Sequence, residues 1–362
     1  LSMHQLSTGV KTRHPPKISR MNTQAPTHRP SRITRAIALL EYLAPAWFAM
    51  VMGWCGLSQA WLRATDIFGD TALGLGLIAA IFAQLIFVLL CLACIVRLQV
   101  HPNAVAADMR HPVRHAFMAT LPVSILLLAS LGINLFWGTD RTLDTALTFL
   151  WCVGSVLEVA ATAWVISRWL KASENGGIQW ATFTPVFFIP VVGNVLAPLG
   201  GVSIGLEAWA TAQFGVGLFL WVVLQTLFFV RLAQAGPLPA RLAPSLFITI
   251  VPPSISGLSL LQLDAPLTAA WMMWGIGAFF LLLALTQIAA IREQPFSMAH
   301  WGMSFPLAAF TSLTLRMTHA PGGAWLQIPA TLLLAITSLL IVGLTLNTWH
   351  GLRHGHLLAP EK

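Results

Sequence analysis

Charged residues are scarce in this chain. Asp, Glu, Lys and Arg make up only 9% of its 362 residues, whereas 57% are hydrophobic. Soluble domains carry roughly 25% charged residues, so the composition excludes an ordinary soluble protein. The apolar sequence instead divides into ten segments of about 20–28 residues, each long enough to cross a hydrocarbon core of about 30 Å. We expect an all-α polytopic membrane protein with segments at approximately 37–62, 72–97, 116–137, 143–168, 183–205, 209–233, 241–262, 267–291, 296–317 and 325–349.

Cysteines and catalytic motifs are equally sparse. Two of the four cysteines, Cys91 and Cys94, have the spacing of a metal or redox motif. They lie in an apolar segment without a second ligand pair, which favours a packing role. The sequence lacks a phosphate-binding glycine loop, a zinc-protease helix and a nucleophile elbow. It also shows no polar cluster at one membrane depth, so it predicts neither an enzyme nor a cofactor- or metal-dependent protein.

Proline is abundant, and it is sorted between alternate segments. A proline inside a helix removes a backbone hydrogen bond and bends the helix, and lipid cannot satisfy the freed carbonyl. The even-numbered segments have only Pro266 and Pro329, near their starts. We therefore expect five helical hairpins, each with a bent odd helix lining an inner pore and a straight even helix in an outer ring. The odd-segment prolines are Pro45, Pro122, Pro185, Pro190, Pro198, Pro244, Pro252, Pro253 and Pro306.

Lysine and arginine are distributed unequally between the two predicted sides. Of the 20 basic residues, 17 fall on the side of the termini, against Arg63, Arg141 and Arg316 on the other. Cytoplasmic loops are enriched in Lys and Arg, which predicts cytoplasmic termini in a multi-pass protein of the cytoplasmic (inner) membrane. The net charge of +8 then reflects this bias and attraction to anionic lipid, not binding of nucleic acid. Basic loops would also raise the local anion concentration at a pore mouth.

The polar ends flank one membrane domain. Residues 1–36 are basic and rich in Pro, Ser and Thr, which predicts a disordered cytoplasmic arm. Met3 and Met21 are the candidate natural starts. Residues 37–350 are expected to form the ten-helix domain, and residues 351–362 a short cytoplasmic tail.

Ionisable residues within the membrane are costly and usually functional, and this chain has few. Glu158, about midway along the fourth segment, is either a proton-coupling carboxylate or a structural acid bonded to a neighbouring helix. Its place on a straight, outer segment favours the structural role. His300, early in the ninth segment, is either a group that titrates at the cytoplasmic vestibule or a satisfied interfacial residue. With so few charges, the lumen is expected to be nearly neutral, which disfavours a strongly coupled pump.

Several motifs resemble one family. His111-Pro112-Val113-Arg114, followed by Phe117, is similar to the signature before the third helix of the tellurite-resistance/dicarboxylate transporter (TehA-like) family, which includes the plant guard-cell slow anion channel. Further resemblances follow in the same order as in that family, and together they cover nearly everything after residue 40. They are Val191-Val192-Gly193-Asn194, Phe214-Gly215-Val216-Gly217 and Trp301-Gly302-Met303-Ser304-Phe305-Pro306.

The resemblance implies ten helices in five hairpins, a pore in each subunit of a homotrimer, and a phenylalanine of the ninth helix that plugs the pore. The matching residue here is Phe305; a ring across a neutral lumen closes it by excluding water. Pro306 follows directly and would let the helix adjust. Gly53, Gly193 and Asn194 are then candidate pore-lining residues, together with the prolines Pro122, Pro252 and Pro306. Gly193 either lines the lumen or allows close helix packing. His111 and Arg114 are placed at the cytoplasmic vestibule, where Arg114 either anchors the third helix or adds positive charge.

The sequence thus predicts passage of small anions through a central pore gated by Phe305. The candidate substrates are monovalent anions such as chloride or nitrate, C4-dicarboxylates such as malate, and sulfite or tellurite-related oxyanions. The alternative is a proton-coupled carrier for dicarboxylate, sulfite or tellurite-related anions that uses Glu158.

Overall fold

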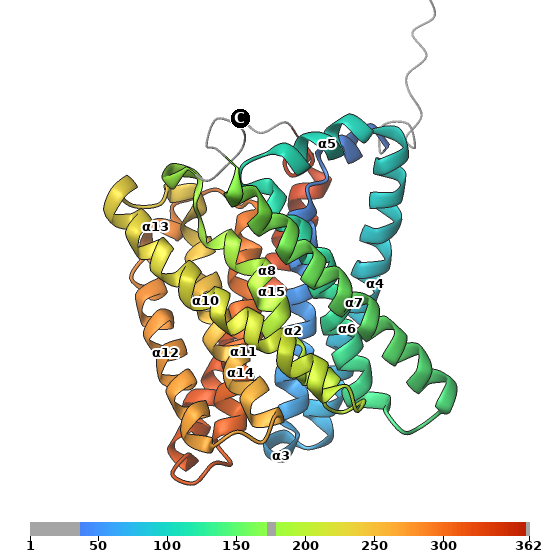
Figure 1. The fold of residues 1–362 in the computed structure, drawn as a ribbon, viewed down its shortest axis with the longest axis vertical. Coiled ribbons are helices and arrows are strands. Elements are labelled where there is room, and N and C mark those ends of the chain that lie inside the picture. The colour runs from blue at the N-terminus through green and yellow to red at the C-terminus, as the bar shows by residue number, and fades with distance from the viewer. Residues whose placement is uncertain (1–36, 172–178, 360–362) are drawn as a thin grey trace, which may run out of the picture.

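The computed structural model describes residues 37–171 and 179–359, and all regular structure in these residues is helical. The expected arm, residues 1–36, lies outside the described residues. The long helices in Figure 1 run roughly parallel to one another across the molecule. They are α4 (Asp70–Val100), α6 (Thr120–Phe136), α7 (Arg141–Ser167), α10 (Glu207–Ala235), α12 (Leu267–Leu285) and α15 (Gln327–Arg353).

Shorter α-helices precede α4, α10, α12 and α15 in the chain. These are α2 (Ala49–Arg63), α8 (Ile189–Leu196), α9 (Pro198–Gly201), α11 (Val251–Gln262) and α14 (Ser304–Met317). The described residues also form small elements: η1 (Leu40–Tyr42), α3 (Thr65–Phe68), α5 (Pro102–Arg110), η4 (Arg168–Leu170), η6 (Trp180–Thr182), α13 (Ile288–Arg292) and η10 (Ala324–Leu326). We call the two ends of the bundle the α5 end, which also holds α13, and the α3 end (Figure 1).

A 3-10 helix precedes the first α-helix of each odd segment. The five lead-ins are η2 (Pro45–Phe48), η3 (Arg114–Ala119), η7 (Pro185–Phe188), η8 (Ala240–Ile250) and η9 (Met298–Met303). The positions of these 3-10 helices explain where the prolines lie. Pro122, Pro190, Pro252 and Pro306 each fall within the first three residues of the α-helix that follows. There the missing N–H costs little, so the backbone changes at a 3-10 to α junction and not at a kink inside a long helix.

Burial separates the odd segments from the even ones. We compare the most apolar run of 18 residues in each segment. In this run, 72% of residues are buried in Arg114–Phe136 and 83% in Ala240–Gln262, against 17% in α4 and 22% in α12. All of α8 is buried, and so is every residue of α2 from Met50 to Ala60. The exposed faces of the long helices are apolar; for example, Phe149 is 70% exposed and Leu339 is 74% exposed. Such faces suit contact with lipid hydrocarbon.

The buried helices pack on one another in a closed ring. α2 contacts α6, α6 contacts α8, α8 contacts α11, α11 contacts α14, and α14 returns to α2. Each ring helix also packs on the long helix that follows it in the chain: α2 on α4, α6 on α7, α8 on α10, α11 on α12 and α14 on α15. The interior of this ring is therefore the place to look for a site.

Seven of the described helices are long and apolar enough to cross a membrane, and Pro185–Gly201 is a shorter apolar stretch. α2 and α14, with 15 and 14 residues, are not among the seven. These findings support a multi-pass helical membrane protein. The division into ten spans remains a prediction.

Candidate functional site

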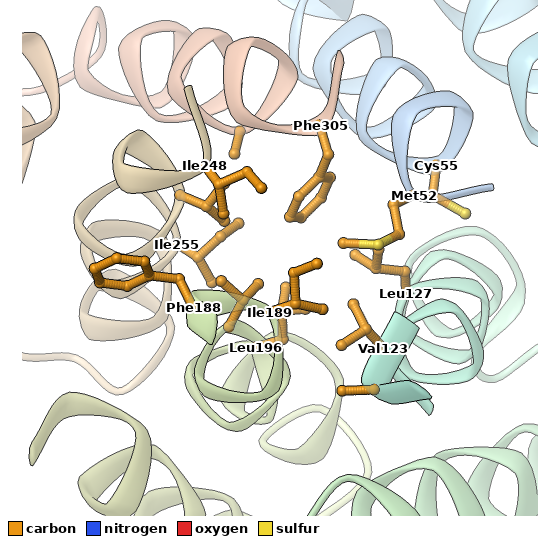
Figure 2. Packing of buried hydrophobic residues seen from close by; sticks show 14 of the residues in the cluster. Met52, Cys55, Val123, Leu127, Phe188, Ile189, Leu196, Ile248, Ile255 and Phe305 are labelled. Atoms are coloured by element: carbon orange, nitrogen blue, oxygen red, sulfur yellow. The ribbon is translucent and has the colours of Figure 1, made fainter. Parts of the chain in front are cut away.

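Side chains from all five ring helices converge on the ring interior. Figure 2 shows Met52, Val123, Ile189, Ile255 and Phe305 pointing toward a common centre. They come from α2, α6, α8, α11 and α14 respectively. Two cavities lie along this axis, one toward each end of the bundle, and both are lined by residues of the same five segments.

The larger cavity lies toward the α5 end and contains about 630 Å³ of empty space, part of it open to solvent. Apart from Ser245, its described lining carries no hydroxyl, amide or charged side chain. The lining residues are Ala46, Ala49, Met52, Phe117, Val186, Ile189, Val192, Leu242, Ser245, Ile248, Val251, Met298, Ala299, Trp301, Gly302, Phe305 and Pro306. This half of the axis matches the neutral lumen that the sequence predicts.

The smaller cavity lies toward the α3 end and contains about 340 Å³ of empty space, part of it open to solvent. Its lining is more polar, with Gln59, Arg63, Ser130 and Ser312 among the lining residues. The others are Gly56, Leu127, Leu196, Leu199, Ile255, Leu258, Phe305 and Ala309. The two halves of the axis therefore differ in chemistry.

Phe305 is the one residue that lines both cavities within the described chain. Its side chain is 4% exposed and lies at the second position of α14. Gly56 of α2 faces the phenyl ring of Phe305. A Cβ built at Gly56 would lie 3.1 Å from Cδ2 of Phe305 and 2.8 Å from Cβ of Ala308. The phenyl ring of Phe305 thus lies between the two cavities. A larger residue at position 56 would clash with it.

A single face of α2 runs along the axis. Ala49 and Met52 line the larger cavity, and Gly56, Gln59 and Arg63 line the smaller one. Spacings of three and four residues place side chains on one side of an α-helix. The same periodicity on α14 places Phe305, Ala309 and Ser312 in line.

The predicted pore-lining prolines and Gly53 differ in whether they line these cavities. Pro306 lines the larger cavity. Pro122 and Pro252 are buried at the starts of α6 and α11, and neither lines a cavity. Gly53 packs against α14 instead, since a Cβ there would lie 2.5 Å from Oγ of Ser304. Its small size serves the close approach of two ring helices.

Gly193 and Asn194 lie on α8 but contact the outer helices. A Cβ at Gly193 would overlap the carboxyl group of Glu158 on α7. Nδ2 of Asn194 donates to Oγ1 of Thr162 at 2.7 Å and to the carbonyl of Pro190 at 2.8 Å. Neither residue is among those lining the two cavities, and their contacts fix α8 against α7.

Glu158 is fully buried on α7. Neither of its carboxylate oxygens has a hydrogen-bond partner among the described residues. An unpaired ionised carboxylate in such a place is expensive, so the group is either uncharged here or serves a function. Its contact with Gly193 places it behind the ring helix α8, away from both cavities.

His300 lies in η9 and is 8% exposed. Its Nδ1 is 3.2 Å from the backbone nitrogen of Ser297 and 3.2 Å from the Ser297 carbonyl, and it closes the first turn of η9. Its neighbours Ala299 and Trp301 line the larger cavity, but His300 does not.

His111 and Arg114 lie at the α5 end. Nδ1 of His111 accepts from the backbone N–H groups of Val113 and Arg114, both at 3.1 Å, and so shapes the turn before α6. Arg114 is 3.2 Å from a carboxylate oxygen of Asp108. Arg97 binds the other oxygen of Asp108 at 2.7 Å. This ion-pair cluster ties α4, α5 and η3 together.

Sequence reasoning missed Arg63 and Gln59 as residues of the axis. It counted Arg63 only among the basic residues of one membrane side and predicted a nearly neutral lumen. The structure corrects this at the α3 end, where Arg63 lines the smaller cavity. The signal was present as the helical spacing of Met52, Gly56, Gln59 and Arg63, which continues the axial face of α2 to its last residue.

Known proteins match the chain along most of its length. Over 309 residues it is 25% identical to an uncharacterised transporter of Methanocaldococcus jannaschii, covering 76% of this chain and 83% of that protein. It is 26% identical to the S-type anion channel SLAH2 of Arabidopsis thaliana over 247 residues, covering 67% of this chain and 46% of the plant protein. It is 22% identical to a tellurite resistance protein TehA homologue of Haemophilus influenzae over 280 residues, covering 76% and 82%.

A match to a protein family agrees with the resemblance that the motifs around His111, Gly193 and Phe305 indicate. A sequence model of the SLAC1 family, described as a voltage-dependent anion channel, matches residues 42–349. That range includes all five ring helices and both cavities. The chain therefore belongs to the SLAC1 family of anion channels and transporters.

Proposed function

We propose that this chain passes small anions through the ring of five helices and that Phe305 is the gate. The observation that carries the proposal is that Phe305 borders both axial cavities. An apolar constriction in a narrow lumen excludes water and therefore ions. Rotation of the ring about its χ1 bond into either cavity would join the two cavities into one path.

The proposal places the ring helices and their five partners across the membrane as ten spans. The described basic residues at the α5 end include Arg97, Arg110, Arg114, Arg168 and Arg292. Because positive residues are retained on the cytoplasmic side, the α5 end faces the cytoplasm in this arrangement. Three such chains form a homotrimer in the cytoplasmic membrane, each with its own pore.

The expected substrates are monovalent anions, such as chloride or nitrate, or C4-dicarboxylates such as malate. Flux runs down the electrochemical gradient, because neither cavity contains the buried carboxylates typical of a coupled pump. The plant relative is named an anion channel, which supports this class of substrate for the present chain.

Flux measurements on purified full-length protein in liposomes test the proposal. Chloride, nitrate, malate and sulfite are compared with potassium, for the wild type and for Phe305→Ala. We expect faster anion flux in Phe305→Ala and no potassium flux in either protein. Absence of anion flux in both proteins, or potassium flux equal to anion flux, would contradict the proposal.

A proton-coupled carrier is the second candidate function, favoured by the full burial of Glu158 with both oxygens unpaired. Its carboxyl group contacts Gly193 behind α8, so a proton there would act on the axis only through movement of α8. Glu158→Gln distinguishes the two functions. A carrier that uses Glu158 loses pH-dependent uptake in this variant, whereas the proposed channel keeps its flux.

A further inference from the structure

The smaller cavity contains a positively charged side chain held in a defined position. Arg63 ends α2 and is half-buried. Its Nη1 donates to Oε1 of Gln59 at 2.9 Å and to the Gln59 carbonyl at 3.2 Å. These two bonds use one nitrogen of the guanidinium group and leave Nη2 and Nε without a partner among the described residues. The remaining donors are therefore available to a ligand.

The same bonds fix the orientation of the Gln59 side chain. Arginine is only a donor, so the Gln59 atom that faces Nη1 must be the oxygen. Nδ2 of Asn134 donates to that oxygen as well, at 3.2 Å. Gln59 is 8% exposed and lines the cavity, and its Nε2 amide has no hydrogen-bond acceptor among the described residues. The amide group thus adds a second set of donors beside the guanidinium.

Ser312 adds an independent indication of a ligand. It is 2% exposed, lines the smaller cavity, and its Oγ has no hydrogen-bond partner within the described chain. A buried hydroxyl without a partner costs free energy. Ser312 lies two turns after Phe305 on the same face of α14, so this hydroxyl is part of the axial lining just beyond the ring.

No described carboxylate balances the charge of this cavity. Neither Arg63 nor Arg316 forms an ion pair with an Asp or Glu in the part of the chain that the structure describes. The positive charge of Arg316 also repels the positive charge of Arg63. Arg63 is also the one charged residue in the described lining of this cavity, so the lining is positively charged, which favours an anion.

We propose that Arg63, Gln59 and Ser312 form a binding site for one monovalent anion on the α3 side of Phe305. The inference deepens the proposed function and rests on it for the role of the site in conduction. One cavity-lining guanidinium with neutral amide and hydroxyl donors suits a single negative charge. A planar oxyanion such as nitrate also fits the fork of guanidinium donors. The site holds the anion next to the closed gate and sets the monovalent selectivity of the path.

Nitrate binding to the purified full chain tests the site without requiring conduction. The thermal unfolding temperature is measured against nitrate concentration, with gluconate replacing nitrate at constant ionic strength. A ligand that binds the native state raises this temperature in a saturable way. We expect Arg63→Gln to raise the half-saturating nitrate concentration by about tenfold or more, because a charge-assisted contact is lost. Arg141→Gln removes the same charge at the same end but outside both cavities, and we expect no change.

Ser312→Ala provides a variant that does not depend on the folding of Arg63→Gln. It removes only a buried, unpaired hydroxyl, so the protein is expected to fold as the wild type does. We expect its half-saturating nitrate concentration to rise by about threefold, a loss at the low end for a neutral hydrogen bond. An unchanged value in Ser312→Ala and Arg63→Gln, or an equal effect of Arg141→Gln, would overturn the site.

Flux in the Phe305→Ala background separates this inference from the proposed function. We expect Arg63→Gln to lower nitrate flux several-fold and to weaken the preference for nitrate over malate, with no effect of Arg141→Gln. If Phe305→Ala conducts and Arg63→Gln changes neither binding nor flux, the site is wrong and the channel stands. If Phe305→Ala carries no anion while Arg63-dependent binding persists, the channel proposal is wrong and the site stands.

Discussion

The ring of Phe305 packs over Gly56, with only 3.1 Å between Cδ2 of the ring and the position that a Cβ of residue 56 would occupy. The contact joins α14 to α2, two neighbours in the ring of helices. It places the proposed gate against backbone instead of against a side chain. The position of the ring is therefore set by the close approach of these two helices.

Substitution of Gly56 by Ala tests this close approach. The added methyl group would lie 2.8 Å from Cβ of Ala308, which is attached to the backbone and cannot rotate away. Overpacking of this kind typically costs about 1–3 kcal/mol, so we expect Gly56→Ala to lower the thermal unfolding temperature. Ala308→Gly in the same chain removes that clash and is expected to restore part of the loss. Unfolding of Gly56→Ala at the wild-type temperature would show that α2 and α14 are less tightly packed than described.

The contact between Gly193 and Glu158 leads to a similar prediction for the outer helices. A methyl group at Gly193 would overlap the Glu158 carboxyl group, so Gly193→Ala is expected to destabilise the packing of α8 on α7. Shortening the opposing side chain in Gly193→Ala/Glu158→Ala frees the space and is expected to recover stability. The measurement is thermal unfolding of both variants beside Glu158→Ala alone. Equal unfolding temperatures for Gly193→Ala and the double variant would contradict the predicted contact.

The ion-pair cluster at Asp108 is expected to show a strong difference between its two arginines. Arg97 has a side chain only 5% exposed and binds Asp108 at 2.7 Å, whereas the Arg114 side chain is 33% exposed. Removing one partner of a buried pair costs about 3–5 kcal/mol, and a partly exposed pair contributes about 0–1 kcal/mol. We expect Arg97→Gln to lower the unfolding temperature strongly and Arg114→Gln to lower it only slightly. Comparable losses in the two variants would show that the cluster does not behave as a buried pair.

Proline and motif patterns predicted which segments form the ring. Proline is tolerated where a 3-10 helix passes into an α-helix, and each odd segment contains such a junction. The same pattern predicts bends inside long helices. In the structure most of these prolines lie at helix starts instead, and Pro244 lies inside η8. Seven of the described helices, and not ten, are long and apolar enough to count as membrane-crossing on their own.

The chemistry of the axis was harder to predict. The sequence predicts that Gly53 lines the lumen and that Gly193 either lines it or allows close helix packing. In the structure each lies against a neighbouring helix, at Ser304 and Glu158 respectively. A glycine in an apolar segment has the same appearance in either role. Arg63 was assigned to the membrane surface because it lies at the end of its segment, and only the rotation of α2 places it on the axis.

A size series at position 305 tests the central claim most directly. Anion current is measured in planar bilayers for Phe305, Phe305→Leu, Phe305→Val and Phe305→Ala. The matched control is Phe310→Ala, since Phe310 is 2% exposed on the same helix, stacks on Trp274 and lines neither cavity. We expect the current to rise stepwise as the side chain at position 305 becomes smaller and to stay at the wild-type level in Phe310→Ala. Equal currents across the series, or the same increase in Phe310→Ala, would contradict a gate formed by Phe305.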